Sequence, residues 1–210
     1  MQSNLNEKKE AKEEIYLILA DFFKNPNEDL YYQIYNGSID KRLEELYIIA
    51  GYNYPNTFSL KNKLEDYTSY VNCFTHCFSG ITKPYAPPIE SVYKVWTDDP
   101  SNEMYNQKGY IFGDSALHIK YLFNHYKLEV PEEFKSLPDH LTLLLELLAY
   151  LIKFKTPKEI EQLIIDHFDW LEDFEKELSK VENSSIYLDI TRLIVNSTQS
   201  ELLYLKANKE

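Results

Sequence analysis

The sequence predicts an all-α protein, a single helical-bundle domain of about eight to ten helices. Apolar side chains recur every three or four residues over most of the chain, which is the period of one helix face. No segment alternates apolar and polar residues as a half-buried strand does. Only 5 of the 210 residues are Gly, few for a β-rich protein. The length suits one domain, spanning residues 1–210.

The N-terminal half, residues 1–80, reads as a series of helices. We expect them over residues 9–24, 27–37, 38–51 and 58–80. Gly37 and Gly51 are placed to end the second and third helices. In the fourth segment one helical face carries Leu60, Leu64, Tyr67, Val71, Phe74 and Phe78. This spacing predicts one long amphipathic helix that ends at Gly80.

The helical pattern breaks in a long Pro-rich connection, residues 81–113. This segment holds four prolines and two glycines, with a short helical or extended piece predicted around 91–96. A connection of this length within a compact chain is usually functional or mobile. It separates the N-terminal half from the C-terminal half, residues 114–210.

Helical spacing returns in the C-terminal half. We expect helices over residues 113–128, 138–152, 156–180 and 184–206. Asp114 or Ser115 is a suitable N-cap for the first of them. Thr156 followed by Pro157 is a typical start for the third. The second is apolar almost all round, so it should be the central, most buried helix.

The start of that central helix carries an Asp-His pair, Asp139 and His140. Ser136 and Asp139 have the spacing of a capping box, and Pro138 is tolerated in a first turn. Asp139 would also complement the positive end of the helix dipole. His140 has helical spacing to Leu144, Leu147 and Leu151, which favours a satisfied core histidine. A role in recognition remains the alternative for both residues.

Charge and composition exclude several classes of protein. The net charge of −12 argues against nucleic-acid binding and permits a basic partner. No run of 18 apolar residues predicts a membrane span, and the N-terminal residues show no secretory signal. Two cysteines are too few for a disulfide scaffold. We therefore expect a cytoplasmic protein without stable membrane insertion.

Metal and catalytic motifs are weak. Cys73, His76 and Cys77 form one small cluster, which two core cysteines explain better than zinc because no second cluster follows. A helical-bundle metal site would draw on His118, His125, His140 and His167. However, the Glu-x-x-His pairs of di-iron bundles do not occur. We expect no enzyme activity and no cofactor or metal.

Four segments carry recognisable motifs: EIYLILADFFKNP (14–26), PYAPPIESVY (84–93), residues 116–152 with their Pro-Asp-His, and residues 164–194 with their His-x-x-Trp-x-x-x-Phe. In this order they resemble the TorD/DmsD/NarJ family of redox-enzyme maturation chaperones. They cover most of the chain in the family's order. Many members have Gly after the tyrosine that matches Tyr126, where this chain has Lys127. The client enzyme is not fixed by these segments.

The resemblance implies an all-helical chaperone for a molybdenum-cofactor oxidoreductase. Such proteins bind the twin-arginine leader, and often the apo-enzyme, until the cofactor is inserted. The family's Asp-His motif is implicated in leader binding, so Asp139 and His140 are the first candidates. Glu90, Ser91 and Tyr93 form the second set, and Tyr126 and Asp114 complete the candidate list.

A twin-arginine leader offers two guanidinium groups followed by an apolar segment, so a receptor needs carboxylates beside an apolar groove. The candidate carboxylates are Glu90, Asp98, Asp99, Asp114 and Asp139. The long connection permits a monomer or a domain-swapped homodimer. A generic helical scaffold that binds other peptides is the alternative function, and a helical-bundle metalloprotein is a further one.

Overall fold

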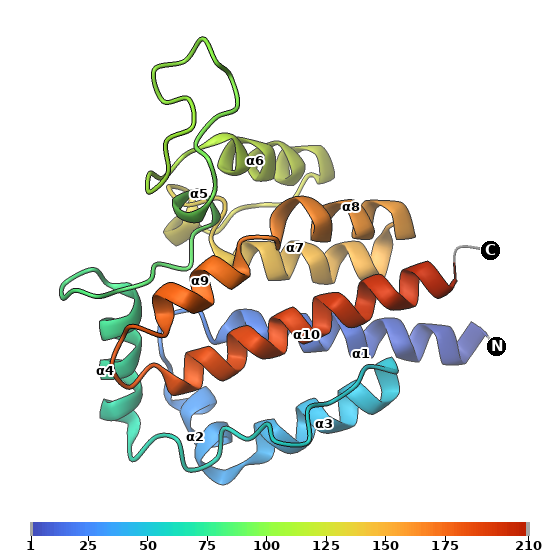
Figure 1. The fold of residues 1–210 in the computed structure, drawn as a ribbon. Helices are drawn as coiled ribbons and strands as arrows, with labels where there is room; N and C mark the ends of the chain where they lie inside the picture. Colours follow the sequence, from blue (N-terminus) through green and yellow to red (C-terminus); the bar gives the residue numbers. More distant parts are fainter. Residues whose placement is uncertain (1, 209–210) are drawn as a thin grey trace.

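The computed structural model describes residues 2–208, and its regular structure is helical (Figure 1). The helices are α1 (Gln2–Asp21), α2 (Glu28–Asn36), α3 (Ser38–Ala50), α4 (Tyr67–Phe78), α5 (Glu90–Tyr93), α6 (Asp114–Tyr126), α7 (Leu141–Phe154), α8 (Pro157–His167), α9 (Leu171–Leu178) and α10 (Ser185–Ala207). A 3-10 turn, η1 (Glu132–Phe134), precedes α7. Within the described residues no β-strand forms, so the predicted all-α fold is confirmed.

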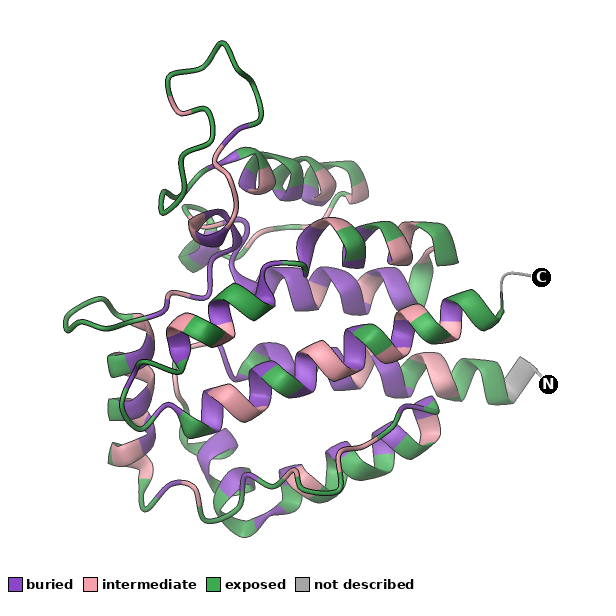
Figure 2. Ribbon diagram, viewed as in Figure 1, coloured by how far each residue is buried: buried purple, intermediate pink, exposed green. Residues whose placement is uncertain are grey.

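The core is built around α7. Ten of its fourteen residues are buried, and it packs against α1 and α8 (Figure 2). Its one strongly polar core side chain, Thr142, donates a hydrogen bond to the carbonyl of Ala20 on α1 at 3.4 Å. Burial of a leucine side chain stabilises a fold by about 1.5–3 kcal/mol, and α7 buries seven of them. The predicted central helix is confirmed.

Several helix boundaries follow the local sequence signals. Gly37 and Gly51 end α2 and α3 with φ of 77° and 76°, a left-handed conformation that costs little only for Gly. Thr156 and Glu159 form the reciprocal hydrogen bonds of a capping box at the start of α8. The last helix also occupies the predicted residues to within one position. These ends were predictable because their partners are neighbours in sequence.

The predicted helix over 58–80 is wrong in its first third. Helix α4 begins only at Tyr67, after an Asp66 N-cap that forms a capping box with Ser69. The preceding residues are held by Asp40 of α3, whose carboxylate accepts hydrogen bonds from the backbone N–H groups of Leu60 and Lys61 at 3.0–3.2 Å. A contact about 20 residues away in sequence therefore competes with helix formation.

The predicted helix over 156–180 is two helices, α8 and α9. The indole N–H of Trp170 donates a hydrogen bond to the carbonyl of His167 at 2.9 Å. That carbonyl is the acceptor that the backbone N–H of Leu171 would need to continue the helix. Trp170 thus helps to end α8, and a new helix starts at Leu171.

Two further boundaries differ from the prediction. The N-cap of α6 is Gly113 rather than Asp114 or Ser115. A Cβ atom on Gly113 would lie 2.7 Å from the carbonyl oxygen of Trp96, so only Gly permits this close approach. The first helix starts at Gln2 and ends at Asp21, earlier at both ends than residues 9–24. The two cysteines, Cys73 and Cys77, are buried as free thiols.

The segment 79–113 contains α5 and otherwise irregular backbone. Its second part projects from the bundle as an exposed loop beside α6 (Figures 1 and 2). Trp96 closes the base of this loop. Its backbone N–H donates to the carbonyl of Gln107 at 2.7 Å, and its carbonyl accepts from the N–H of Asp114 at 2.8 Å.

Candidate peptide-binding site

The Asp-His motif joins the start of α7 to the Pro-rich segment that contains α5. The two segments run antiparallel, with the backbone N–H of Leu141 donating to the carbonyl of Pro88 at 2.9 Å. The N–H of Glu90 donates to the carbonyl of Asp139 at 3.2 Å. The carboxylate of Asp139 accepts a hydrogen bond from the N–H of Ser91 at 2.7 Å. We call this set of contacts the α5–α7 junction.

The predicted capping box of Ser136 and Asp139 does not form. Helix α7 begins at Leu141, so Ser136, Pro138 and Asp139 all precede its first turn. Asp139 instead satisfies a free N–H in the first turn of α5, a short helix 48 residues earlier in the chain. Asp139 therefore caps a helix, but not the helix that the sequence suggested.

His140 is the N-cap of α7 rather than a member of its apolar face, which corrects the second expectation. Its Nδ1 accepts a hydrogen bond from the backbone N–H of Thr142 at 3.3 Å. Its ring lies 4.8 Å from that of Phe134, centroid to centroid. Burial lowers the pKa of His140 to about 4, so the ring is neutral near pH 7 with its proton on Nε2.

A chain of three side chains extends from this junction to the surface. His167 Nδ1 lies 2.8 Å from the carboxylate of Glu90, and His167 Nε2 lies 2.8 Å from Nδ1 of His118. The ammonium group of Lys94 lies 3.3 Å from the same carboxylate. Glu90 and His167 are 0% and 2% exposed, whereas His118 is exposed. These residues fasten α5, α8 and α6 to one another.

The charges of Glu90, His167 and His118 depend on one another. Burial raises the pKa of Glu90, and hydrogen bonding and charge from His167 oppose that rise, as does Lys94. Burial, followed by the proximity of His167, lowers the pKa of His118. With Glu90 ionised, Nδ1 of His167 donates a hydrogen bond to it. Between the two rings, one of the facing nitrogens carries a proton and donates a hydrogen bond to the other. The contact accommodates at most one proton between the two facing nitrogens.

Ser91 and Tyr93 are also part of the α5 region. Tyr93 is buried and stacks on Trp170 with ring centroids 5.3 Å apart and an interplanar angle of 18°. Burial raises the pKa of Tyr93. Ser91 contributes its backbone N–H to Asp139, and its buried hydroxyl makes no hydrogen bond within the described residues.

Tyr126 and Asp114 lie apart from the junction, at opposite ends of α6 and about 18 Å from each other along its axis. The hydroxyl of Tyr126 donates to Glu159 at 3.1 Å, and burial with the Glu159 contact raises its pKa to about 12. Asp114 is exposed and accepts a long hydrogen bond, 3.4 Å, from the N–H of Asp98. Five of the seven predicted residues thus come together and two do not.

A groove of ≈ 780 Å³ follows the connection from α6 to α7 and ends at Pro138, next to Asp139. Its apolar lining residues are Phe123, Leu128, Val130, Pro131 and Pro138. Its charged lining residues are Lys120, Glu129, Glu132 and Lys135. Glu132 is paired with Lys135, while Glu129 is exposed and makes no ion pair with any described residue. The groove combines apolar surface with carboxylates, as an amphipathic basic peptide requires.

Sequence reasoning missed the Glu90–His167–His118 chain and the groove. His167 has helical spacing to Ile160, Ile164 and Leu171, which indicates burial but names no partner. No local pattern connects Glu90 with a residue 77 positions later. Among the described residues, no three His, Cys, Asp or Glu side chains are arranged to hold a metal ion. None of the described helices has the length and apolar character to cross a membrane.

The fold and the junction define an all-helical protein whose Pro-rich segment is fixed to an Asp-His motif. The model of the nitrate reductase delta subunit family matches residues 54–180, more than half of the chain. The chain therefore belongs to that family. The matched residues include the α5–α7 junction and the whole groove. The resemblance to the TorD/DmsD/NarJ family is confirmed.

Two curated relatives are similar to the chain. A probable Tat proofreading chaperone DmsD from Haemophilus influenzae is 28% identical over 136 residues, 64% of this chain and 61% of that protein. A chaperone protein TorD from Shewanella piezotolerans is 25% identical over 125 residues, 59% of this chain and 56% of that protein. The matches thus span less than two thirds of either relative.

A solved structure supports the fold. The crystal structure of a protein from Archaeoglobus fulgidus, titled a putative redox enzyme maturation protein, aligns with a TM-score of 0.55 at 22% sequence identity. The alignment covers 88% of this chain and 93% of that one. At this level of identity the likeness establishes the shared helical fold.

Proposed function

We propose that this protein is a cytoplasmic chaperone for a molybdenum-cofactor oxidoreductase. It binds the twin-arginine leader of the catalytic subunit, and the apo-enzyme itself, until the cofactor is inserted, and it catalyses no reaction. The observation that carries the proposal is the family match over residues 54–180, together with relatives that are named as Tat proofreading and TorD chaperones.

The groove beside Pro138 is the proposed leader site. Its apolar wall of Phe123, Leu128 and Val130 suits the apolar part of a leader, and Glu129 and Glu132 suit the arginines. Arginine pairs well with carboxylates because two N–H groups can donate in parallel to the two oxygens. Glu129 is free for such a pair, and Glu132 would exchange Lys135 for a leader arginine.

The buried candidates act by positioning the groove. Asp139 is 1% exposed and His140 8%, so neither side chain offers a surface to a peptide in this conformation. Asp139 instead fixes the end of the groove to α5, and His140 fixes it to α7. Glu90, Ser91 and Tyr93 hold α5 in place for the same purpose. Asp114 and Tyr126 belong to the helix that forms the other wall, outside the lining itself.

Electrostatics favour a basic partner. The chain carries a net charge of −12, which would speed association with a basic leader and weaken with added salt. Ordering a flexible leader costs roughly 2–5 kcal/mol of the gross interaction, so an affinity on the order of micromolar is expected. The protein acts on protein clients and not on nucleic acid, as a monomer or as a homodimer that exchanges helices across residues 81–113.

Substitutions in the groove test this assignment. Glu129→Gln and Glu132→Gln each remove one lining carboxylate, whereas Glu133→Gln removes the exposed carboxylate of the residue after Glu132, which does not line the groove. All three variants change the net charge equally. Titrating a fluorescently labelled leader should give a dissociation constant raised about threefold to tenfold in each of the single variants E129Q and E132Q. The matched control E133Q should bind within about twofold of the unmodified protein.

The comparison between variants separates local from general electrostatics. If E133Q weakens binding as much as either lining variant, the net charge alone governs association and the groove assignment is wrong. If none of the three changes the affinity, the leader binds elsewhere on the molecule.

A further inference from the structure

A second cavity lies at the other end of the bundle, where the start of α1 and the end of α10 meet the end of α7 and the start of α8. Its volume is ≈ 220 Å³. Its walls are formed largely by apolar side chains, among them Ile152, Ile160 and Leu205. Four of its twelve lining residues are lysines, an unusual concentration in a chain with only 22 Lys and Arg and a net charge of −12.

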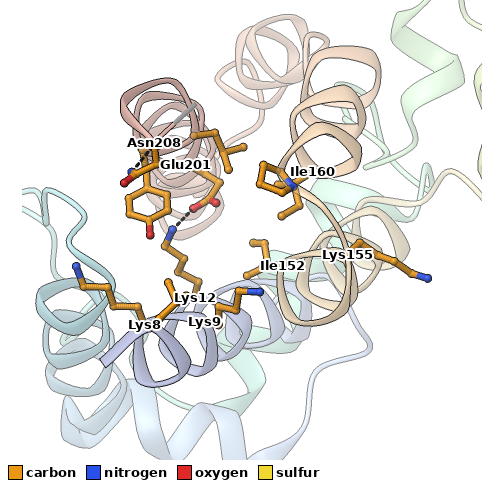
Figure 3. A pocket seen from close by; sticks show the side chains of 12 residues that line it. Lys8, Lys9, Lys12, Ile152, Lys155, Ile160, Glu201 and Asn208 are labelled. Atoms are coloured by element: carbon orange, nitrogen blue, oxygen red, sulfur yellow. Dashed lines mark hydrogen bonds and ion pairs between the residues drawn. The ribbon is translucent and has the colours of Figure 1, made fainter. Parts of the chain in front are cut away.

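One of these lysines is buried in an ion pair on the cavity wall. Lys12 lies 2.7 Å from the carboxylate of Glu201, and the two side chains are 3% and 2% exposed (Figure 3). Glu201 also accepts a hydrogen bond from the hydroxyl of Tyr52, and the Lys12 ammonium lies 3.3 Å from the ring centroid of Tyr204. Glu201 is therefore satisfied by two partners and is electrically balanced by Lys12.

Lys9 adds to this cavity a positive charge that no described residue balances. Its ammonium group extends across the cavity toward Ile152, whereas the ammonium groups of Lys8 and Lys155 point away from it (Figure 3). Lys155 instead lies over the ring of Tyr126, 4.6 Å from its centroid. Lys9 makes no ion pair with the described residues.

The lysines of α1 also repel one another. Burial lowers the pKa of Lys12, Glu201 opposes this change, and the nearby charges of Lys8 and Lys9 lower it further. An anion placed between Lys9 and Lys12 would relieve that repulsion. The attraction within a buried ion pair repays only part of the desolvation energy that the pair costs. Contact with a ligand would therefore give Lys12 a role beyond stabilising the fold.

We propose that this cavity binds a small aliphatic carboxylate. The carboxylate lies between Lys9 and Lys12, where charge-assisted hydrogen bonds are available from both ammonium groups. The aliphatic chain extends along the apolar wall beside Ile152 and Ile160. This site is separate from the leader groove, which is lined by residues 120–138, and it does not depend on the proposed chaperone function.

Three eight-carbon probes distinguish charge from apolar binding. We would titrate the full chain with octanoate, octan-1-ol and octylamine by calorimetry. Octanoate should bind saturably with a dissociation constant on the order of 100 µM. Octan-1-ol should bind about tenfold more weakly, because it lacks the charge, and octylamine should show no saturation. Equal binding of octanoate and octan-1-ol, or no saturation by octanoate at millimolar concentration, would overturn the proposal.

Two neighbouring lysines give a matched pair of variants. Lys9→Gln and Lys8→Gln change the net charge equally, and both side chains are partly exposed, so neither should disturb folding. Lys9→Gln should weaken octanoate binding about fivefold, while Lys8→Gln should leave it within about twofold. Equal effects of the two substitutions would show that octanoate responds only to general charge, and the site would be wrong.

Discussion

The carboxylate of Asp139 accepts a hydrogen bond from the backbone N–H of Ser91 at 2.7 Å, across 48 residues of sequence. This contact closes the N-terminus of α5 and attaches it to the residues that begin α7. Because α7 is the most buried helix, the Pro-rich segment is held directly by the core. The position of the groove, which ends at Pro138, depends on the same contact.

Asp139→Ala should lower the free energy of unfolding by about 1–3 kcal/mol, because it leaves the buried N–H of Ser91 without an acceptor. Asp139→Asn keeps an oxygen at that position and should lose about 1 kcal/mol or less. Urea denaturation followed by circular dichroism measures both. Equal losses in the two variants would show that the charge of Asp139, and not its acceptor oxygen, stabilises the junction.

His140 makes the stability of the protein depend on pH. Its pKa is about 4 in the folded chain and about 6.5 when unfolded, so the unfolded state takes up the proton first as pH falls. The stability lost in this way begins near pH 6.5 and is complete below about pH 4. His140→Asn keeps an N-cap acceptor but does not titrate. The free energy of unfolding of the native chain should therefore fall by up to about 3 kcal/mol more than that of the variant over this range.

Denaturation with urea at intervals from pH 7 to pH 4 makes that comparison. Other titrating groups, including His118, are common to both proteins and cancel in the difference. Parallel pH profiles for the native chain and His140→Asn would show that His140 is not held neutral.

The Glu90–His167 contact should behave as a buried polar pair. His167→Leu leaves the fully buried Glu90 carboxylate with Lys94 alone and should cost about 3–5 kcal/mol. Replacing both residues, as Glu90→Met with His167→Leu, removes the uncompensated group and should cost less than His167→Leu by itself. Urea denaturation of the three proteins tests this order. A double variant that is less stable than His167→Leu would contradict it.

Lys127 occupies a conformation that suits glycine. It ends α6 with φ of 57° and ψ of 40°, in the left-handed region that favours Gly at the end of a helix. Lys127→Gly should raise the free energy of unfolding by up to about 1 kcal/mol. Lys120→Gly, an equal change on the exposed middle of α6, should lower it by about 1 kcal/mol. Thermal denaturation of both variants suffices, and a loss of stability in Lys127→Gly would contradict the interpretation.

Sequence was a good guide wherever the decisive partner was local. The ends of α2, α3 and α8 depend on a glycine or a capping residue within a few positions of the helix. It failed where a distant group took over a local role. Asp40 holds Leu60 away from the helix that its apolar spacing predicts, and Trp170 takes the carbonyl that would have continued α8.

The candidate site shows the same division. The resemblance singled out Asp139, His140 and the α5 residues, and the structure places these side by side. The resemblance gave no indication that these residues are buried or that His167 contacts Glu90, because those facts depend on how α5, α6 and α8 pack. Ser136 and Asp139 have the residue types and spacing of a capping box, but the carboxylate of Asp139 instead accepts a hydrogen bond from the backbone N–H of Ser91.

Calorimetric titration with a twin-arginine leader peptide, beside the same peptide with Lys-Lys, tests the central claim most directly. The leader should come from a molybdoenzyme encoded near this gene. We predict saturable binding of one Arg-Arg peptide per chain, weakened about fivefold or more by the Lys-Lys exchange, because lysine cannot donate two parallel hydrogen bonds to a carboxylate. Equal affinity for the two peptides, or no binding of any leader, would contradict the proposal that this chain recognises twin-arginine leaders.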